Sequence, residues 1–232
     1  MAAPGQAQLT DRRTPAERHM VAAMVEFLRE APGPHRVLNV GAGKSTAVED
    51  RLIAAGVELL CDRADVIDCR VDHPAAGECR RCSVEDMTPV ESNAYRALFA
   101  NYVLEHVHDA ARAAGEIFRV LAPGGRLFVT IPNPSAPEHR LARWTPTRLH
   151  RLATGRASFE TRYDYGRVPG LVNLLGQAGL VVVQVRYDSF IEGYLGRWPG
   201  LGWLGRAYDR IVTALNARSL MGNVCLVMEK PA

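Results

Sequence analysis

Residues 36–45 read RVLNVGAGKS, a short apolar run followed by a turn that contains two glycines. A bounded apolar run of this length is typical of a buried strand, and the glycines allow the backbone to turn sharply and to approach a ligand closely. Val48 and Leu52 then recur at the spacing of a helix. Strand, glycine turn and helix in this order predict the first unit of a parallel α/β sheet.

The same alternation continues along the chain. Helices are predicted over 15–30, 46–55 and 109–121, and strands over 36–40, 57–61, 96–101, 126–131, 181–186 and 224–228. We therefore predict one Rossmann-like α/β domain over 15–232 after a flexible tail over 1–14. Two segments, at about 133–168 and 189–220, interrupt the alternation with prolines, arginines and aromatic residues. Because both follow strands at the edge where α/β sheets bind ligands, they are expected to cap a pocket.

Composition excludes several classes of protein. The 232 residues are 47% hydrophobic and 23% charged, which supports a sizeable core and argues against general disorder. A formal net charge of +3 is too small to predict nucleic acid as a partner. The sequence lacks an apolar run of about 18 residues and a signal-peptide core. A cytoplasmic location follows as a prediction, and the five cysteines are expected to be reduced there.

The glycine turn is a candidate binding site for a nucleotide-like cofactor. Helix N-termini offer free backbone N–H groups, and Gly41 and Gly43 allow close approach. Asp62 is predicted to end the second strand, 21 residues after Gly41. A carboxylate at that place can accept hydrogen bonds from both ribose hydroxyls of an adenosine.

Three other interpretations compete for the same turn. A phosphate-binding loop needs a glycine five positions before Gly43, where Leu38 stands. A nicotinamide-binding fingerprint needs a glycine at position 46, which is Thr46. A tight packing turn without a ligand is the third. Two other functions therefore stay open: a P-loop-like nucleotide phosphotransferase, and a non-catalytic α/β module that binds a cofactor.

Three further stretches decide between these functions by resemblance. Residues 97–107 (ALFANYVLEHV), 116–127 (EIFRVLAPGGRL) and 82–87 (CSVEDM) resemble, in order and spacing, motifs of class I S-adenosylmethionine-dependent methyltransferases that act on small molecules. The resemblance implies a seven-stranded, mostly parallel sheet whose last strand, 224–228, is antiparallel. It also implies S-adenosyl-L-methionine as cofactor and a small-molecule methyl acceptor as partner.

The resemblance assigns roles to single residues. Asp62 would hold the ribose and Asn101 would lie beneath the methionine moiety, while the other expected cofactor contacts are Asn39, Gly41, Ala42, Gly43, Ser83, Val84 and Glu85. Two of these depart from the family pattern. Asn39 stands where an acid usually lies near the methionine amino group, and Ser83 stands where an aspartate often binds the adenine amine. An amide and a hydroxyl can still form hydrogen bonds at these places.

His106 is the candidate catalytic residue. It follows the strand over 96–101, and a neutral imidazole can take the proton that leaves a hydroxyl acceptor. The alternative is that His106 forms a local structural hydrogen bond. An acceptor that is already nucleophilic would need no base at all.

Two clusters leave more than one interpretation open. Cys69, His73, Cys79 and Cys82 include one pair with the spacing of zinc ligands, but buried free cysteines are favoured and no metal is predicted. Trp198 and Trp203 either pack within the cap or contact a membrane surface peripherally.

Overall fold

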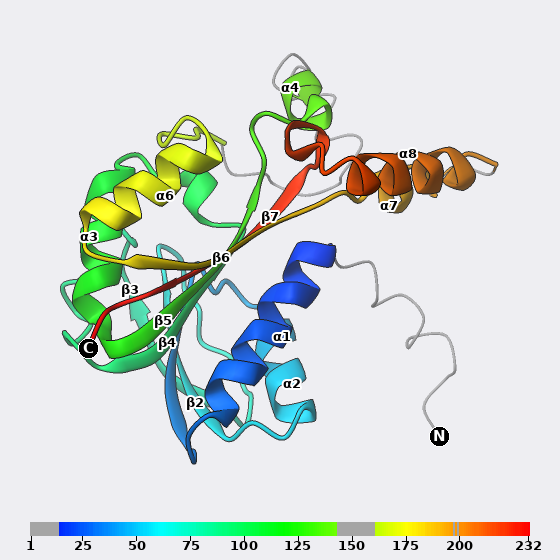
Figure 1. Cartoon of the computed structure of the whole chain (residues 1–232). Helices are drawn as coiled ribbons and strands as arrows, with labels where there is room; N and C mark the ends of the chain where they lie inside the picture. The colour runs from blue at the N-terminus through cyan, green and yellow to red at the C-terminus, as the bar shows by residue number, and fades with distance from the viewer. Residues whose placement is uncertain (1–13, 143–160, 197, 199) are drawn as a thin grey trace, which may run out of the picture.

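The computed structural model describes residues 14–142, 161–196, 198 and 200–232 (Figure 1). Its centre is a seven-stranded sheet with the strand order β3-β2-β1-β4-β5-β7-β6. The strands are β1 His35–Val40, β2 Leu59–Asp65, β3 Ala76–Arg81, β4 Tyr95–Asn101, β5 Leu121–Pro132, β6 Val181–Asp188 and β7 Asn223–Glu229.

The directions of the strands confirm the predicted fold class. The pairs β1–β2, β1–β4, β2–β3 and β4–β5 are parallel, whereas β7 runs antiparallel to both β5 and β6. The strand predicted over 224–228 lies within β7, so the prediction of an antiparallel last strand is also confirmed.

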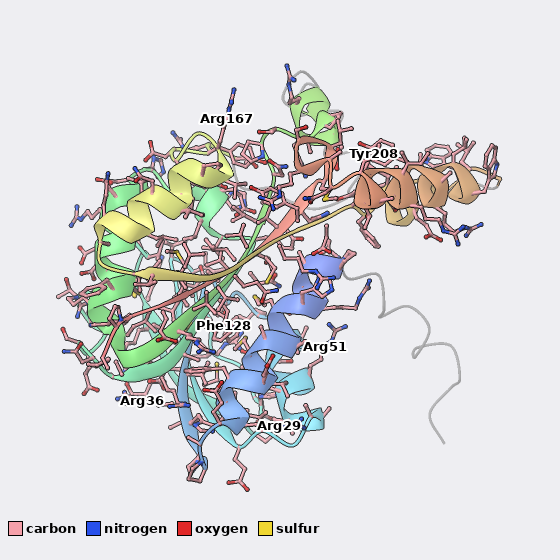
Figure 2. All side chains as sticks on the ribbon, in the orientation of Figure 1. Arg29, Arg36, Arg51, Phe128, Arg167 and Tyr208 are labelled. Carbon is pink, nitrogen blue, oxygen red and sulfur yellow. A yellow bond between two sulfur atoms is a disulfide. The ribbon has the colours of Figure 1, made fainter. Side chains whose placement is uncertain are left out.

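Helices cover both faces of the sheet (Figure 1). On one face lie α1 Pro15–Arg29 and α2 Ala47–Ala54, and on the other lie α3 Ala110–Val120 and α6 Val168–Gln177. Phe128 of β5, labelled in Figure 2, packs against Phe27 of α1 with a distance of 5.9 Å between the ring centroids. Because both faces are covered, the inner strands are nearly continuous apolar runs, as residues 37–40 show.

The second strand differs from its prediction. It begins at Leu59 and continues to Asp65, whereas the sequence predicted a strand over 57–61. The charged pair Asp62 and Arg63 suggested an end to the strand, but both side chains are buried and bonded within the sheet. Strand β3 and helix α6 were not among the predicted elements.

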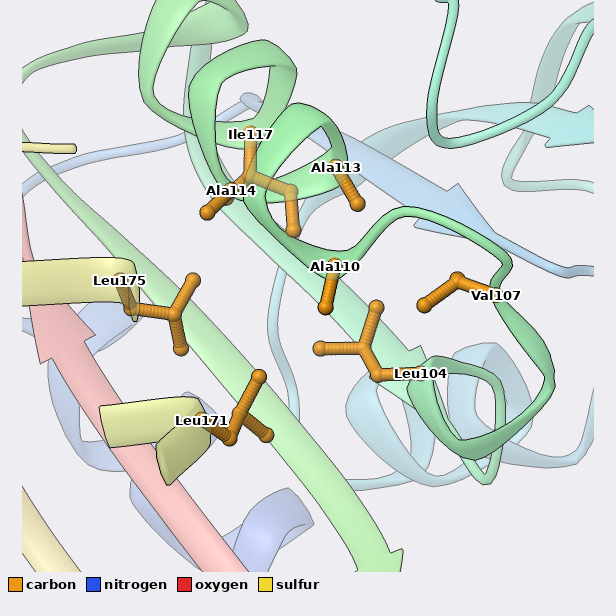
Figure 3. Close-up of a pocket in the computed structure, with 8 residues that line it drawn as sticks. All are labelled: Leu104, Val107, Ala110, Ala113, Ala114, Ile117, Leu171 and Leu175. Atoms are coloured by element: carbon orange, nitrogen blue, oxygen red, sulfur yellow. The ribbon is translucent and has the colours of Figure 1, made fainter. Parts of the chain in front are cut away.

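A small gap lies between α3 and α6 (Figure 3). It has no room for a water molecule, and its lining consists of Leu104, Val107, Ala110, Ala113, Ala114, Ile117, Leu171 and Leu175. Ligand pockets usually measure about 300–1,000 Å³ and present a few polar groups. This gap therefore belongs to the packing of the core, and the functional site is sought at the carboxyl ends of the strands.

The remaining elements lie beyond those ends of the strands. They are η1 Leu104–His106, α4 Pro137–Ala142, α7 Ile191–Leu195, α8 Gly202–Ala214 and η2 Arg218–Leu220. The predicted tail over 1–14 and the middle of the predicted cap over 133–168 fall almost entirely outside the described residues. Among the residues that are described, none of the helices is long and apolar enough to cross a membrane.

Candidate functional site

The glycine turn after β1 has two different glycines. Gly41 has a φ of +67°, and a Cβ there would lie 2.3 Å from a methyl group of Val103. Gly43 has a φ of +49°, and a Cβ there would meet no atom within 4 Å. Both backbone conformations favour glycine. Gly41 is therefore required by packing within the protein, while Gly43 borders open space that a ligand can fill.

Asp65 is the last residue of β2, and its carboxylate lies against this turn. The backbone N–H of Gly43 donates to Asp65 Oδ2 at 2.8 Å, and that of Ile67 donates to Oδ1 at 3.0 Å. Each carboxylate oxygen keeps a further lone pair for a ligand. Asp65 was not predicted as a site residue, because the predicted strand ended at residue 61 and β2 continues to Asp65. The register of the two strands shows why β2 is longer: Val40 at the end of β1 pairs with Ala64, so β2 continues as far as β1 does.

Asp62, the predicted ribose-binding acid, lies three residues before the end of β2 and is buried. The hydroxyl of Tyr95 donates to its carboxylate at 2.7 Å, the backbone N–H of Glu78 at 2.8 Å and the guanidinium of Arg80 at 3.2 Å. Burial by itself raises the pKa of Asp62, but these bonds outweigh it and hold the pKa below its usual value. The prediction that Asp62 ends the strand is wrong, and its carboxylate joins β2 to β3 and β4.

Arg63 holds the glycine turn from beneath. Its buried guanidinium donates to the carbonyl of Ala42 at 3.0 Å, to that of Ser45 at 2.8 Å and to that of Cys69 at 3.1 Å. It also forms a buried ion pair with Glu49 of α2. One side chain thus fixes the turn, the start of the α2 segment and the loop after β2 relative to one another.

Asn39 belongs to the same buried network. Its Nδ2 donates to Glu49 Oε1 at 2.8 Å, and Glu49 Oε2 is buried without a hydrogen-bond partner. The acid that the methyltransferase pattern expects at position 39 is therefore replaced by an amide backed by the carboxylate of Glu49.

The segment with Ser83, Val84 and Glu85 lies between the ends of β2 and β4. The N–H of Cys82 donates to the carbonyl of Asp65 at 3.0 Å. The carboxylate of Glu85 accepts from the backbone N–H of His108, beyond β4. Val84 is buried in the core, and the Ser83 hydroxyl accepts from the N–H of Glu85 at 3.2 Å. The structure thus brings these three predicted residues next to the turn.

The end of β4 meets the same turn. Asn101 closes β4, and its amide oxygen accepts from the hydroxyl of Thr130 at 2.5 Å. Tyr102 follows with a φ of +57°, which sends the chain sharply into Val103. The contact between Val103 and Gly41 places η1 directly beside the glycine turn.

Glu105 and His106 belong to η1, the short helix that follows β4. His106 Nε2 lies 3.8 Å from Glu105 Oε1. Glu105 is buried, and this burial raises the pKa of its carboxyl to about 8. His106 was predicted and Glu105 was not, although an acid within the otherwise apolar stretch over 97–107 indicates a buried functional group.

A tyrosine completes this group. Tyr165 is buried, and burial together with the nearby Glu105 carboxyl raises the pKa of its phenol. Neither Glu105 Oε2 nor the Tyr165 hydroxyl has a hydrogen-bond partner among the described residues. The N–H groups of Arg162 and Tyr163 donate to the carbonyl of Glu105 at 2.8 and 3.1 Å, which fixes the segment that carries Tyr165.

Lys44 points toward the loop after β2. Its Nζ donates to Asp68 Oδ2 at 3.1 Å and to the carbonyl of Arg70 at 2.9 Å. A phosphate-binding loop uses its lysine on the phosphates. This lysine is already engaged with its own chain, which disfavours the P-loop interpretation.

The cysteines differ from their prediction. Cys69 and Cys79 form a disulfide with their Cα atoms 5.8 Å apart, so the prediction that all five cysteines are reduced is wrong for this pair. The pairing of β3 with β2 brings Cys79 beside Arg63 and hence near Cys69. His73 contacts Asp50 at 3.1 Å instead. Nowhere in the described chain do three or more histidine, cysteine or acidic side chains gather in a way that could hold a metal ion.

The arrangement suits an adenosine-containing cofactor. Open space over Gly43, the carboxylate of Asp65 and the segment over 83–85 lie together at the ends of β1, β2 and β4. A carboxylate at a strand end can accept from two ribose hydroxyls. The residues present therefore fit the cofactor that the sequence motifs imply.

Comparisons with known proteins agree with this geometry. A family model described as a methyltransferase domain matches residues 13–185. The ribosomal protein L11 methyltransferase of Syntrophotalea carbinolica is 34% identical over 118 residues, which are 49% of this chain and 37% of that protein. This chain thus matches little more than a third of the length of that relative.

Solved structures share the fold. An S-adenosylmethionine-dependent methyltransferase from Mesorhizobium loti superposes with a TM-score of 0.59 at 16% identity, covering 92% of this chain and 97% of that one. The geranyl diphosphate C-methyltransferase of Streptomyces coelicolor, solved with S-adenosyl-L-homocysteine, gives a TM-score of 0.51 at 15% identity, covering 90% and 76%. At such identities the likeness speaks for the fold alone.

Proposed function

This chain belongs to the S-adenosylmethionine-dependent methyltransferases, and we propose that it methylates a small-molecule acceptor bound beyond the carboxyl end of β4. The observation that carries the proposal is that Glu105 Oε2 and the Tyr165 hydroxyl are buried without hydrogen-bond partners among the described residues. Glu105 closely follows Val103, which contacts the glycine turn at Gly41. Polar atoms buried without partners suit a small acceptor that enters the site and satisfies them. The geranyl diphosphate enzyme with the same fold acts on such an acceptor.

In the proposed cofactor site, Asp65 takes the ribose role that was predicted for Asp62. Gly43 leaves room for the cofactor, and Ala42 and Gly41 carry the turn that Arg63 fixes. Ser83, Val84 and Glu85 border the adenine. Asn39 and Asn101 present amides to the methionine part. When bound, S-adenosylmethionine supplies an electrophilic methyl group on its sulfonium sulfur.

The residues after β4 are proposed to handle the acceptor. With a pKa of about 8, Glu105 is mostly protonated at neutral pH and can donate a hydrogen bond to an acceptor oxygen or nitrogen. His106, 3.8 Å away, is placed to take the proton of a hydroxyl acceptor. Holding the acceptor in line with the methyl group supplies much of the acceleration.

Calorimetry with S-adenosylhomocysteine, ATP and NAD tests the class of protein. We expect a heat of binding with S-adenosylhomocysteine, but not with ATP or NAD. Binding of ATP in its place would favour a phosphotransferase. A panel of small amines, alcohols and prenyl or phosphate-bearing compounds, assayed for S-adenosylhomocysteine formation beside purified ribosomal protein L11, then tests the acceptor. Methylation of L11 but of none of the small compounds would contradict a small-molecule acceptor. Cofactor binding without any transfer would favour the non-catalytic module.

A further inference from the structure

The segment over 189–222 forms an arm between β6 and β7. Helices α7 and α8 lie side by side in it and extend away from the sheet (Figure 1). Asp209 of α8 accepts from the N–H groups of Ile191 and Glu192 at 2.9 Å, so it caps α7. Tyr208, labelled in Figure 2, donates to the carbonyl of Leu220 at 2.9 Å. Hydrogen bonds therefore join the described parts of the arm to one another.

Helix α8 turns its larger apolar side chains away from the protein. Its buried positions are Gly205 and Val212, and Gly205 lies so close to α7 that a Cβ would come within 2.5 Å of Glu192 Cα. The large apolar side chains of α8 and its end are exposed: Trp203 at 60%, Leu204 at 43%, Ile211 at 58% and Leu215 at 73%. At about 100° per residue, these four positions share one sector of about 120° on the side of the helix away from Gly205 and Val212.

Two more large apolar side chains of the arm are exposed. Trp198 is 66% exposed and Leu201 is 40% exposed, and both stand just before α8. We call the six exposed side chains the outer face of the arm: Trp198, Leu201, Trp203, Leu204, Ile211 and Leu215. Large apolar side chains exposed together on one segment in this way indicate an interaction site.

The charge of the arm is positive. Its sequence contains Arg197, Arg206, Arg210 and Arg218 against Glu192 and Asp209, four cations minus two anions, which gives +2. Glu192 pairs with Arg206 at 2.9 Å, and Asp209 caps α7. Around the helix axis, Arg206 and Arg210 lie next to Trp203, at one edge of the apolar sector. An apolar helix face with tryptophan and an arginine edge complements the interface of an anionic bilayer.

We propose that the outer face of the arm docks on the headgroup region of a membrane that contains anionic phospholipid. The apolar side chains enter the boundary between headgroups and acyl chains, while the exposed Arg210 extends to the phosphates. The contact is peripheral, and it needs no spanning helix. The sheet then stands away from the bilayer at the other end of the arm.

Co-sedimentation of the full chain with vesicles tests this proposal. The vesicles contain phosphatidylcholine alone, or phosphatidylcholine and phosphatidylglycerol in equal parts. We expect binding to the mixed vesicles, weakened by salt. The double variant Trp198→Ser/Trp203→Ser should lower the partition coefficient by roughly tenfold or more, because two large apolar side chains no longer leave water. Arg210→Glu should weaken binding to the mixed vesicles only.

The matched control is Val181→Ser/Val182→Ser in β6, which removes two exposed apolar side chains, 55% and 45% exposed, outside the arm. It should bind vesicles as the unmodified protein does. Failure of the unmodified protein to sediment with mixed vesicles, or equal binding by the tryptophan variant, would overturn the proposal. A dimer in light scattering that the tryptophan variant dissociates, without vesicle binding, would assign the outer face to a second copy.

Discussion

Two aspartates of β2 show that the position of a carboxylate along a strand determines what it can bind. Asp62 and Asp65 are both strand carboxylates, but Asp62 is surrounded by Tyr95, Arg80 and a backbone N–H within the sheet. Asp65 stands at the strand end beside the open space over Gly43. The carboxylate of Asp62 is bonded within the sheet, whereas that of Asp65 borders the place where we propose that the cofactor binds.

Asp65→Ala should lower the affinity for S-adenosylhomocysteine roughly ten- to a hundredfold. It removes a pair of charge-assisted hydrogen bonds to the ribose, worth about 1.5–3 kcal/mol. Calorimetry measures the change. Asp62→Asn is the matched control, and it should lower the free energy of unfolding but leave the affinity unchanged. The opposite result, with Asp62→Asn weakening binding and Asp65→Ala not, would return the ribose role to Asp62.

Glu105→Gln should change how stability depends on pH. The folded carboxyl has a pKa of about 8, above its ordinary value of 4.5, because it is buried. Between these values only the folded state keeps the proton, so the stability of the unmodified protein falls as pH rises through this range, by up to a few kcal/mol. Glutamine does not ionise. Urea unfolding at about pH 5.5 and about pH 8.5 should therefore show the variant gaining relative stability at the higher pH. A constant difference between the two proteins would show that Glu105 is ionised when folded.

His106→Ala addresses the catalytic role that remains a prediction. If the acceptor is a hydroxyl, turnover should fall by about 10²–10⁴ while affinity for S-adenosylhomocysteine changes little. A small loss in turnover is expected for an amine or carbanion acceptor. Equal losses in binding and turnover would show that the imidazole is structural.

At the scale of elements, the site depends on a turn and a loop that neighbouring elements hold in place. The turn after β1 is bonded from beneath by Arg63 of β2, and the loop after β2 is bonded by the same side chain through the carbonyl of Cys69. Glu49 of α2 balances the buried guanidinium. A change in any of these elements should therefore alter the position of the glycine turn.

Comparing Gly43→Ala with Gly56→Ala distinguishes the cost of backbone strain from a direct effect on cofactor binding. Gly43 and Gly56 have φ values of +49° and +78°, and in both cases a Cβ would meet open space. Both variants should lose about 1 kcal/mol of stability, since alanine adopts this conformation poorly. Only Gly43→Ala should weaken binding of S-adenosylhomocysteine, measured by calorimetry. Unchanged binding would make the turn a packing feature.

The disulfide between Cys69 and Cys79 should be visible by alkylation. Unfolded protein without reductant should expose three thiols, those of Cys61, Cys82 and Cys225, and five after dithiothreitol. Closing a loop of this length in the unfolded chain is worth about 2–3 kcal/mol in the chain-entropy account, so reduction should lower the unfolding midpoint. Five reactive thiols without reductant would rule the disulfide out.

The sequence predicted most of the sheet but not the details around β2. The strands β1, β4, β5 and β7 can be recognised from their apolar runs alone, because their residues are buried on both faces of the sheet. Asp62 and Arg63 look like a strand end until their distant partners, Tyr95 and Glu49, are known. The edge strand β3, over 76–81, is charged and partly exposed, so no periodicity marked it. The disulfide depends on the pairing of β3 with β2, and it was missed for the same reason.

At the scale of the whole molecule, cofactor binding should stabilise the fold. At about 100 times its Kd, S-adenosylhomocysteine adds about 2.7 kcal/mol to the free energy of unfolding. For a domain of this size, that corresponds to a rise in Tm of about 5–11 °C. Thermal unfolding with S-adenosylhomocysteine, ATP and NAD at equal concentrations measures it. A shift with ATP or NAD, and none with S-adenosylhomocysteine, would contradict the proposed cofactor.

The order of strands in the sheet also constrains how the protein is made. The ribosome completes β6 before β7, yet in the sheet β7 is inserted between β5 and β6. The five parallel strands can assemble while synthesis proceeds, because all their pairings except that of β5 with β7 are then available. During the same interval, β6 and the arm that follows it wait for the segment over 223–229. A nascent chain stalled before residue 223 should therefore resist protease through β5 and be cleaved within β6. Completion of the sheet then depends on the synthesis of the final strand.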